Sequence, residues 1–515
     1  MARGGIQEES TPLSSGVPGL DDVLRGGFPD GCLYLISGEP GAGKTTLAMQ
    51  FLMAGARADE RCLYITLSET RSEIERVARA HGWDLSKIRI HEMVPSEQNL
   101  SPERQLTVFN PSELELGATT EAMISAVREY KPRRVVLDSL SELRLIAQNA
   151  LRYRRQVLAL KQFFAGRDCT VLMLDDCSGG DWSTSCRGAE GQVESIVHGV
   201  VVLEQIASQY GAERRRLRVS KLRGVAFRGG FHDFAIRRGG LEVFPRLVAS
   251  EHHAEFADET LTSGNGALDA LLGGGIPMGT STLLLGPAGT GKSTVVTQFA
   301  VEAAARGKRT AMYVFDENLG TLRSRSRSLG VSVDGPINDG LLSIRQVDPA
   351  ELSPGEMAAQ IRRAVDGTDG PGMRPAKVIV IDSLNGYVNA MPEETFLIAQ
   401  LHELLAYLGQ MGVVTLLTVT QTGMVGGSMQ SPVDTTYLAD NVILFRYFEF
   451  RGRVRRALSV VKKRSGPHEA TIRELHVTGR GLQVGEPLEQ FTGVLTGVPR
   501  FEGNGDDLEK KVGDA

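Results

Sequence analysis

Two short stretches of the sequence have the spacing of a loop that binds phosphate groups: GEPGAGKTT at residues 38–46 and GPAGTGKST at residues 286–294. Both fit the pattern GxxxxGK[ST] between an apolar run and an amphipathic one, although a glycine-rich turn that only caps a helix is the alternative. The glycines let backbone N–H groups converge on phosphate oxygens, while the lysine neutralises the outer phosphates. The predicted phosphate-binding residues are Gly38, Gly41, Ala42, Gly43, Lys44, Thr45, Thr46, Gly286, Gly289, Thr290, Gly291, Lys292, Ser293 and Thr294.

A bound triphosphate needs Mg²⁺, and hydroxyls and carboxylates are suitable ligands for that ion. Asp138 and Asp382 end the apolar runs RRVVLDSL and AKVIVIDSL, where an acid would hold the ion through its shell. Capping of the following helix is the alternative role for these two acids. With Thr45, Ser293 and Asp316 they form the predicted set of magnesium ligands, and the predicted cofactors are ATP and Mg²⁺.

Hydrolysis of ATP also needs a group that takes a proton from the attacking water. The natural candidate is an acid after the strand that follows the phosphate-loop helix. In the first half this acid is Glu69, in LYITLSET, and in the second half Asp316 and Glu317 occupy the place, in MYVFDENL.

A basic cluster recurs near the end of each half, as SKLRG at 220–224 and VKKRSG at 461–466. We predict that Lys221 with Arg223, and Lys462 with Arg464, reach the γ-phosphate of a nucleotide that a neighbouring subunit holds. Solvated basic turns are the alternative. The predicted role requires an oligomer.

The two phosphate loops belong to a repeat of the whole half-chain. A shift of 248 residues places SGVPGLDDVLRGGFPDG at 15–31 over SGNGALDALLGGGIPMG at 263–279, and also Lys44 over Lys292. Short runs that are apolar without alternation suit strands buried on both faces, and amphipathic stretches such as EIERVARAHGW suit covering helices. Each half is therefore predicted to be an α/β domain with a mostly parallel central sheet flanked by helices.

The predicted organisation follows from the repeat and from polar stretches without periodicity. It comprises a flexible N-terminus at 1–12, a first domain at 13–247, a linker at 248–260, a second domain at 261–495 and a flexible tail at 496–515.

Composition narrows the functional class. The chain has 515 residues, 41% hydrophobic and 23% charged, with a net charge of −5, so no overall basic field attracts nucleic acid or anionic lipid. The five cysteines lack paired spacing, the N-terminus lacks an apolar signal core, and no apolar run is long enough for a membrane span. We expect a cytoplasmic protein without a membrane partner.

The sequence resembles the KaiC family of tandem RecA-like P-loop ATPases, best known from the cyanobacterial circadian clock. The resemblance rests on the entry motif SGVPGLDDVLRGGFP, the acids in LSET and FDEN, the DSL after each second strand, and the segments ERRRLRVSKLRG and DNVILFRYFEFRGRVRRALSVVKKRSGPHEATIREL. It covers residues 13 to 485 approximately. It implies a homohexamer of two stacked rings with ATP between adjacent subunits in both.

The resemblance also implies catalytic acids in Glu-Glu pairs and phosphorylation of an adjacent Ser and Thr. Here the pairs are Ser68-Glu69 and Asp316-Glu317, so the first domain is expected to rely on Glu69 alone. The position of the phosphorylated serine corresponds to Thr436, with Thr435 as the second candidate acceptor. An ordinary surface pair of threonines is the alternative.

The predicted function is a slow ring ATPase with serine/threonine autokinase activity in the second domain, acting as a regulatory or timing switch. The tail differs from the partner-binding end of the clock protein, so a different signalling partner is expected. Two alternatives stay open. One is a DNA-stimulated motor with Arg323, Arg325 and Arg327 lining a channel, which the net acidity disfavours. The other is a scaffold that nucleotide assembles without turnover.

Overall fold

The computed structural model divides into two compact units, Met1–Arg246 and Leu247–Ala515, called domain 1 and domain 2 below. It describes residues 11–93, 111–176, 191–207, 211–348, 350–389, 397–421, 436–495 and 499–502, with only the backbone of 111–115, 191–192 and 389. No helix within these ranges is long and apolar enough to cross a membrane.

Domain 1 is built on one sheet with the strand order β3-β2-β4-β5-β1-β6-β7-β8-β9. The strands from β3 to β6 are parallel, and β7, β8 and β9 continue the sheet with antiparallel pairing. The strands are β1 (Leu33–Gly38), β2 (Cys62–Thr66), β3 (Ile88–Glu92), β4 (Arg134–Asp138), β5 (Thr170–Asp176), β6 (Gly199–Ile206), β7 (Arg214–Leu222), β8 (His232–Arg237) and β9 (Gly240–Phe244).

Domain 2 repeats this topology, with the order β14-β13-β15-β16-β12-β17-β18-β19-β20. The strands are β12 (Ser281–Gly286), β13 (Arg309–Val314), β14 (Leu342–Gln346), β15 (Ala376–Asp382), β16 (Val414–Thr420), β17 (Asn441–Phe450), β18 (Arg453–Lys463), β19 (Arg473–Thr478) and β20 (Gly481–Pro487). The predicted fold of two α/β domains with mostly parallel sheets is confirmed.

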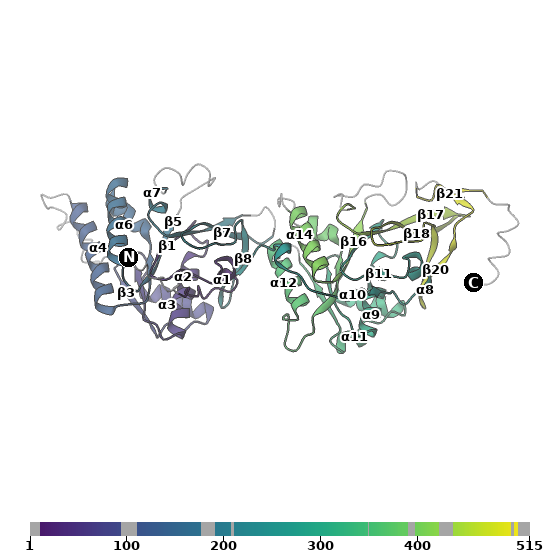
Figure 1. The fold of residues 1–515 in the computed structure, drawn as a ribbon, viewed down its shortest axis with the longest axis horizontal. Helices are drawn as coiled ribbons and strands as arrows, with labels where there is room; N and C mark the ends of the chain where they lie inside the picture. The colour runs from purple at the N-terminus through teal and green to yellow at the C-terminus, as the bar shows by residue number, and fades with distance from the viewer. Residues whose placement is uncertain are drawn as a thin grey trace, which may run out of the picture. The chain divides into compact units, whose positions relative to one another are not determined.

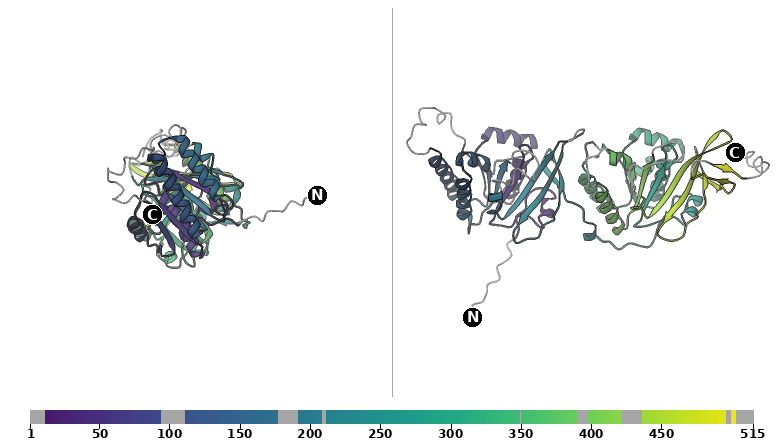
Figure 2. Two further views of the ribbon diagram at one scale, coloured as in Figure 1. Left: turned by 90° about the vertical axis from the view of Figure 1, so that its left-hand side faces the viewer. Right: turned by 90° about the horizontal axis from the view of Figure 1, so that it is seen from above.

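Helices cover both faces of each sheet (Figures 1 and 2). In domain 1 one layer contains α1 (Leu20–Val23), α2 (Lys44–Arg57) and α3 (Arg71–His81), and the other contains α4 (Pro111–Tyr130), α5 (Leu140–Ala147), α6 (Ala150–Phe164) and α7 (Gly191–Glu194). In domain 2 the corresponding layers are α8 (Gly266–Leu271), α9 (Lys292–Ala305), α10 (Leu319–Ser328) and α11 (Asp334–Asn338), and α12 (Pro354–Asp366), α13 (Leu384–Asn389) and α14 (Leu397–Gln410).

The central strands are apolar on both faces because each face is covered. In β1, Leu33 and Leu35 pack in the cluster that contains α4 to α6, whereas Tyr34 and Ile36 pack in the cluster that contains α2. Successive side chains of a strand point to opposite faces, so a doubly covered strand has no alternation of apolar and polar residues. This accounts for the continuous apolar runs in the sequence.

The parallel strands bring the functional segments to one edge of each sheet. In domain 1 the phosphate loop follows β1, Glu69 follows β2, and Asp138 ends β4. The carboxyl ends of parallel strands meet at one edge, where an open α/β sheet binds its ligands. The fold therefore gathers residues from distant parts of the sequence around each phosphate loop.

The segment predicted to be a linker, residues 248–260, packs on domain 2. It contains the short 3₁₀ helix η3 (Ala249–Glu251), and the N–H of Ala249 donates a hydrogen bond of 3.0 Å to Glu403 of α14. The N–H of Ala254 donates to the carbonyl of Gln410 at 3.1 Å. The segment ends at β10 (Thr260–Leu261), which pairs with β11 (Ile276–Pro277).

Part of the tail predicted to be flexible forms a strand. Within 499–502, β22 (Arg500–Phe501) pairs with β21 (Phe491–Thr492). Phe501 packs against Phe450 and Phe491, with ring centroids 5.6 and 5.3 Å away. These aromatic contacts explain the ordered strand. Residues 1–10 and 503–515 lie outside the described residues, so their flexibility stays a prediction.

A buried ion pair joins β13 of the domain 2 sheet to the segment that follows α12. Arg309, at the start of β13, donates two hydrogen bonds to Asp369, with Nη1–Oδ1 and Nη2–Oδ2 distances of 3.0 and 2.6 Å. The arginine side chain is 0% exposed and the aspartate 2%. Removal of one partner of such a pair leaves an uncompensated buried charge, which is far more costly than loss of a surface pair.

We predict that Asp369→Ala lowers the free energy of unfolding of domain 2 by about 3–5 kcal/mol. Urea unfolding of the full chain, followed by exposure of domain 2 peptides to protease, measures this change. The matched control is Glu351→Ala, at an exposed acid of the same domain, which should change stability by less than about 0.5 kcal/mol. Equal effects of the two substitutions would contradict the assigned role of the ion pair.

Candidate active sites

Each phosphate loop turns directly into a helix. α2 starts at Lys44 and α9 at Lys292, and the preceding residues, Gly43 and Gly291, have φ values of 104° and 102°. The positive φ of Gly43 favours glycine there, because L side chains rarely adopt this conformation. The N–H groups of the first helical turn lack intrahelical partners and form a site for an anion.

The two loop lysines are buried but have different partners. Lys44 Nζ donates to the carbonyls of Gly38 and Glu39 at 2.9 and 2.8 Å and lies 2.6 Å from Asp176 Oδ1. Asp176 ends β5, opposite Gly38 in the sheet register. A carboxylate therefore neutralises the ammonium of Lys44.

Lys292 donates to the carbonyls of Gly286 and Pro287 at 2.8 and 2.7 Å. Thr420 takes the register position opposite Gly286, so no carboxylate comes from that position. Burial lowers the pKa of Lys292 to about 8, against a weaker opposing effect of Asp382. A phosphate group would supply the negative charge that this ammonium needs.

The acid at the end of the central strand faces the loop hydroxyl in both domains. Asp138 accepts hydrogen bonds from Thr45 at 2.9 Å and from Tyr64 at 2.5 Å. Asp382 is hydrogen-bonded to Ser293 and accepts a bond of 2.5 Å from Thr418. Burial raises the pKa of both carboxyls.

A hydroxyl and a carboxylate that share a buried site are a donor set that fits Mg²⁺. Thr45 with Asp138, and Ser293 with Asp382, are the residues that would hold the ion. Asp316, the further predicted ligand, accepts a short hydrogen bond from Ser383 and lines the same cleft as Asp382.

The candidate general bases differ between the domains. Glu69 in domain 1 has a buried Oε2 that accepts no hydrogen bond within the described residues. Burial, with Asp138 and Glu73 as further causes, raises the pKa of Glu69. In domain 2, both carboxylate oxygens of Glu317 accept hydrogen bonds from Arg325. In the part of the chain that the structure describes, the domain 2 base is therefore paired with an arginine and Oε2 of the domain 1 base is not.

A cleft of about 730 Å³ brings the domain 2 groups together, within the range of about 300–1,000 Å³ typical of ligand sites. The polar groups that line it include Lys292, Ser293, Thr294, Asp316, Glu317, Arg325, Asp382, Ser383, Asn385 and Arg456.

The predicted basic pairs lie at the opposite end of each sheet. Lys221 Nζ donates to the carbonyls of Glu194 and Val197, and Arg223 donates to that of Ser195. These carbonyls precede β6, whose first residue, Gly199, pairs with Tyr34 near the start of β1. Lys221 and Arg223 are therefore remote from the phosphate loop at the end of β1.

Lys462 and Arg464 have equivalent positions in domain 2. Lys462 Nζ donates to the carbonyls of Thr436 and Ala439 at 2.9 and 2.7 Å. Arg464 pairs with Asp440 at 3.2 Å. The candidate acceptor Thr436 thus lies against this basic pair, whereas Thr435 lies outside the described residues.

The arginines proposed to line a nucleic-acid channel are paired within domain 2. Arg323 and Arg327 lie 3.8 and 2.8 Å from the carboxylate oxygens of Asp334, and Arg325 pairs with Glu317. Their charges are therefore partly neutralised by neighbouring acids.

The other predicted phosphate-binding residues end β1 and β12 or lie in the phosphate loops and the first helical turns: Gly38, Gly41, Ala42, Thr46, Gly286, Gly289, Thr290 and Thr294. The sequence analysis missed Tyr64, Thr418 and Asp176, and it named Arg325 only as a candidate residue of a nucleic-acid channel. A signal existed only for Asp176, because it ends the apolar run TVLMLDD as Asp138 ends RRVVLDSL. A tyrosine or threonine within an apolar strand has no such distinguishing pattern.

Comparisons with known proteins agree with the duplicated fold and loops. Residues 13–248 and 261–489 each match the model of the KaiC ATPase family. The chain is 27% identical over 490 residues to the circadian clock protein KaiC3 of Synechocystis sp., covering 95% of this chain and 94% of that protein.

The chain is also similar to proteins named circadian clock oscillator protein KaiC. It is 28% identical over 501 residues to that of Parasynechococcus marenigrum, covering 97% of this chain and 95% of the relative. It is 28% identical over 490 residues to that of Synechococcus elongatus, covering 94% and 91%. Because both halves match the family model, the chain belongs to the KaiC ATPase family.

Proposed function

We propose that this chain forms a homohexameric ring in which ATP binds between adjacent subunits and is hydrolysed. The observation that carries this proposal is the placement of the basic pairs. Lys221 and Lys462 contact carbonyls that precede β6 and β17, at the amino end of each sheet. The phosphate loops leave the carboxyl ends of β1 and β12.

The basic residues lie too far along the sheet from the phosphate loop of their own domain to complete its nucleotide pocket. Gly199 pairs with Tyr34 and Asn441 with Thr282, four residues before the ends of β1 and β12. Four residues of parallel strand span roughly 13 Å, and Lys221 and Lys462 donate beyond those pairs. A second copy that presents its amino end to the loop of the first would bring the basic residues to the γ-phosphate.

The proposed chemistry assigns each group a task. Lys44 and Lys292 bind the outer phosphates, and Thr45, Asp138, Ser293 and Asp382, with Asp316, hold Mg²⁺, which supplies neutralising charge when bound. Glu69 and Glu317 take the proton from the attacking water. Lys221, Arg223, Lys462 and Arg464 stabilise charge on the transferred phosphoryl group in trans.

We also propose serine/threonine autokinase activity in domain 2, with Thr436 as acceptor and Thr435 as the second candidate. The carbonyl of Thr436 accepts a hydrogen bond from Lys462, which the ring places at the γ-phosphate of the next subunit. A hydroxyl near that phosphate could receive it in line. Such a state would act as a regulatory or timing switch in the cytoplasm, read by a partner protein. The names of the relatives as circadian clock proteins support this view.

Complementation between two inactive subunits tests the placement in trans. In a Glu69→Gln background, Lys292→Ala removes the domain 2 pocket and Lys462→Ala removes the basic group. Each variant alone should show little phosphate release, whereas a one-to-one mixture of exchanging subunits should recover up to about a quarter of domain 2 activity through random pairing.

The control for complementation mixes Lys292→Ala subunits with subunits that carry both substitutions. This mixture should stay inactive because every intact pocket is lost. Native mass spectrometry confirms subunit exchange. If mixed rings form but phosphate release does not recover, the proposed placement of the basic residues in trans is contradicted.

The lowered pKa of Lys292 predicts that the ATP affinity of domain 2 depends on pH. With a pKa of about 8 in the free site, Lys292 is charged below that pH and neutral above it. In a Lys44→Ala background, ATP affinity of domain 2 should be constant up to pH 7.5 or so and then fall by up to about tenfold per pH unit. Equilibrium binding of a fluorescent ATP analogue between pH 7 and 9.5 measures this. Lys292→Arg keeps its charge and should remove the slope. The same slope in both proteins would contradict the role of Lys292.

Phosphopeptide mapping after incubation with Mg-ATP tests the kinase proposal. Phosphate is expected on Thr436 or Thr435 in the wild type and should be absent in Glu317→Gln, which lacks the base. Thr436→Ala should shift or remove the label. If the ring releases phosphate but this peptide is never phosphorylated, the ATPase proposal stands and the autokinase proposal is refuted. A ring that assembles without any phosphate release would indicate a scaffold.

A further inference from the structure

The candidate base of domain 2 is held by an arginine of the following helix. Arg325 Nε lies 3.1 Å from Glu317 Oε1, and Arg325 Nη2 lies 2.8 Å from Glu317 Oε2. The two side chains are 23% and 22% exposed. Charge-assisted bidentate pairs of this kind are stronger than neutral hydrogen bonds, and partial burial limits screening by solvent.

The sequence repeat places no arginine at the corresponding position of domain 1. The repeat that places Glu69 over Glu317 also places Val77 of α3 over Arg325 of α10. Glu69 Oε2 is buried without a hydrogen bond within the described residues. The two domains therefore share a base position but differ in whether a cation occupies it.

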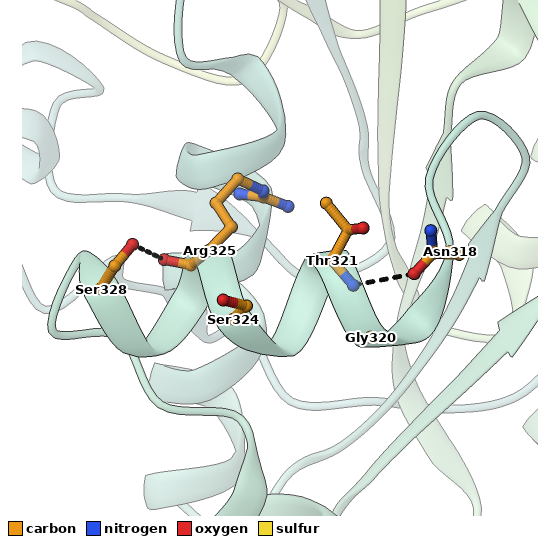
Figure 3. A pocket seen from close by; sticks show the side chains of 6 residues that line it. All are labelled: Asn318, Gly320, Thr321, Ser324, Arg325 and Ser328. Carbon is orange, nitrogen blue, oxygen red and sulfur yellow. Dashed lines mark hydrogen bonds between the residues drawn. The ribbon is translucent and has the colours of Figure 1, made fainter.

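Arg325 lies at the nucleotide cleft and has space on its other side. It lines the cleft that contains Lys292, Asp382 and Glu317. It also lines a second hollow of about 580 Å³ along α10, where Figure 3 shows its guanidinium rising on the same side of the helix as Thr321. The guanidinium can therefore leave Glu317 without unfolding of α10.

We propose that Arg325 is a positioning residue that pairs with Glu317 and restrains ATP hydrolysis in domain 2 relative to domain 1. In the hydrolytic step the water oxygen bonds to the γ-phosphorus, the bond to the ADP oxygen breaks, and the water proton passes to the base. The hydrogen bonds from the guanidinium occupy both oxygens of Glu317 that would otherwise accept that proton. The inference rests on the proposed role of Glu317 as the base.

The test replaces Arg325 in a protein whose domain 1 no longer hydrolyses ATP. In a Lys44→Ala background, Arg325→Val reproduces the residue of domain 1, and Arg325→Met keeps the length of the side chain without its charge. Both should raise kcat for phosphate release by up to about tenfold with KM within about twofold, because the change acts on the proton acceptor rather than on substrate binding. Arg325→Lys should give an intermediate kcat. The same Arg325 variants are also measured in a Glu69→Gln background, which controls for an effect of Lys44→Ala on ring assembly.

The matched control is Arg323→Ala, which removes an arginine of the same helix that pairs with Asp334 instead. It should leave kcat and KM unchanged. A thermal midpoint equal to that of the parent shows that the Arg325 variants are folded.

Glu317→Gln separates failure of this inference from failure of the proposed function. If Glu317→Gln abolishes domain 2 turnover and both Arg325 variants leave kcat unchanged or lower, the restraint is refuted while the base stands. A KM increase of tenfold or more would instead make Arg325 a phosphate ligand and also refute the restraint. If Glu317→Gln has no effect on turnover, the proposed base itself is wrong and the inference falls with it.

Discussion

Each domain of this protein buries a lysine ammonium beneath a phosphate loop, and most features of both sites follow from the need to compensate that charge. Burial of an unpaired cation costs several kcal/mol. Domain 1 supplies a carboxylate, because Asp176 lies 2.6 Å from Lys44. In domain 2 the described hydrogen-bond acceptors of Lys292 are carbonyls, and burial lowers the pKa of Lys292 to about 8 against a weaker opposing effect of Asp382. In domain 1 a bound triphosphate would share Lys44 with Asp176, whereas in domain 2 it would add negative charge beside Lys292.

A second difference concerns the acid that faces the phosphate. Among the described residues no group donates to the buried Oε2 of Glu69, and burial raises the pKa of this carboxyl; both features favour proton abstraction. Glu317 is held by Arg325. Duplication of one fold has thus produced two sites with the same phosphate loop and different electrostatic surroundings.

Much of the fold and part of each site could be predicted from the sequence because they depend on local patterns. The loops at Lys44 and Lys292, and the strand-end acids Asp138 and Asp382, each have a fixed spacing from an apolar run. The contacts that could not be predicted from the sequence depend on which strands pair in the sheet. Asp176 meets Lys44 only because β5 pairs with β1, and Thr418 meets Asp382 because β16 pairs with β15. The antiparallel edge strands were also unassigned, although they carry the basic pairs.

The central claim is that each nucleotide is bound by one subunit and completed by the next. An experimental structure of the protein with Mg²⁺ and a non-hydrolysable ATP analogue tests it most directly. The account predicts a closed ring in which Lys221 and Lys462 each lie within hydrogen-bonding distance of a γ-phosphate on the phosphate loop of a neighbouring copy. A nucleotide enclosed by a single chain, with both lysines still bonded to the carbonyls before β6 and β17, would contradict it.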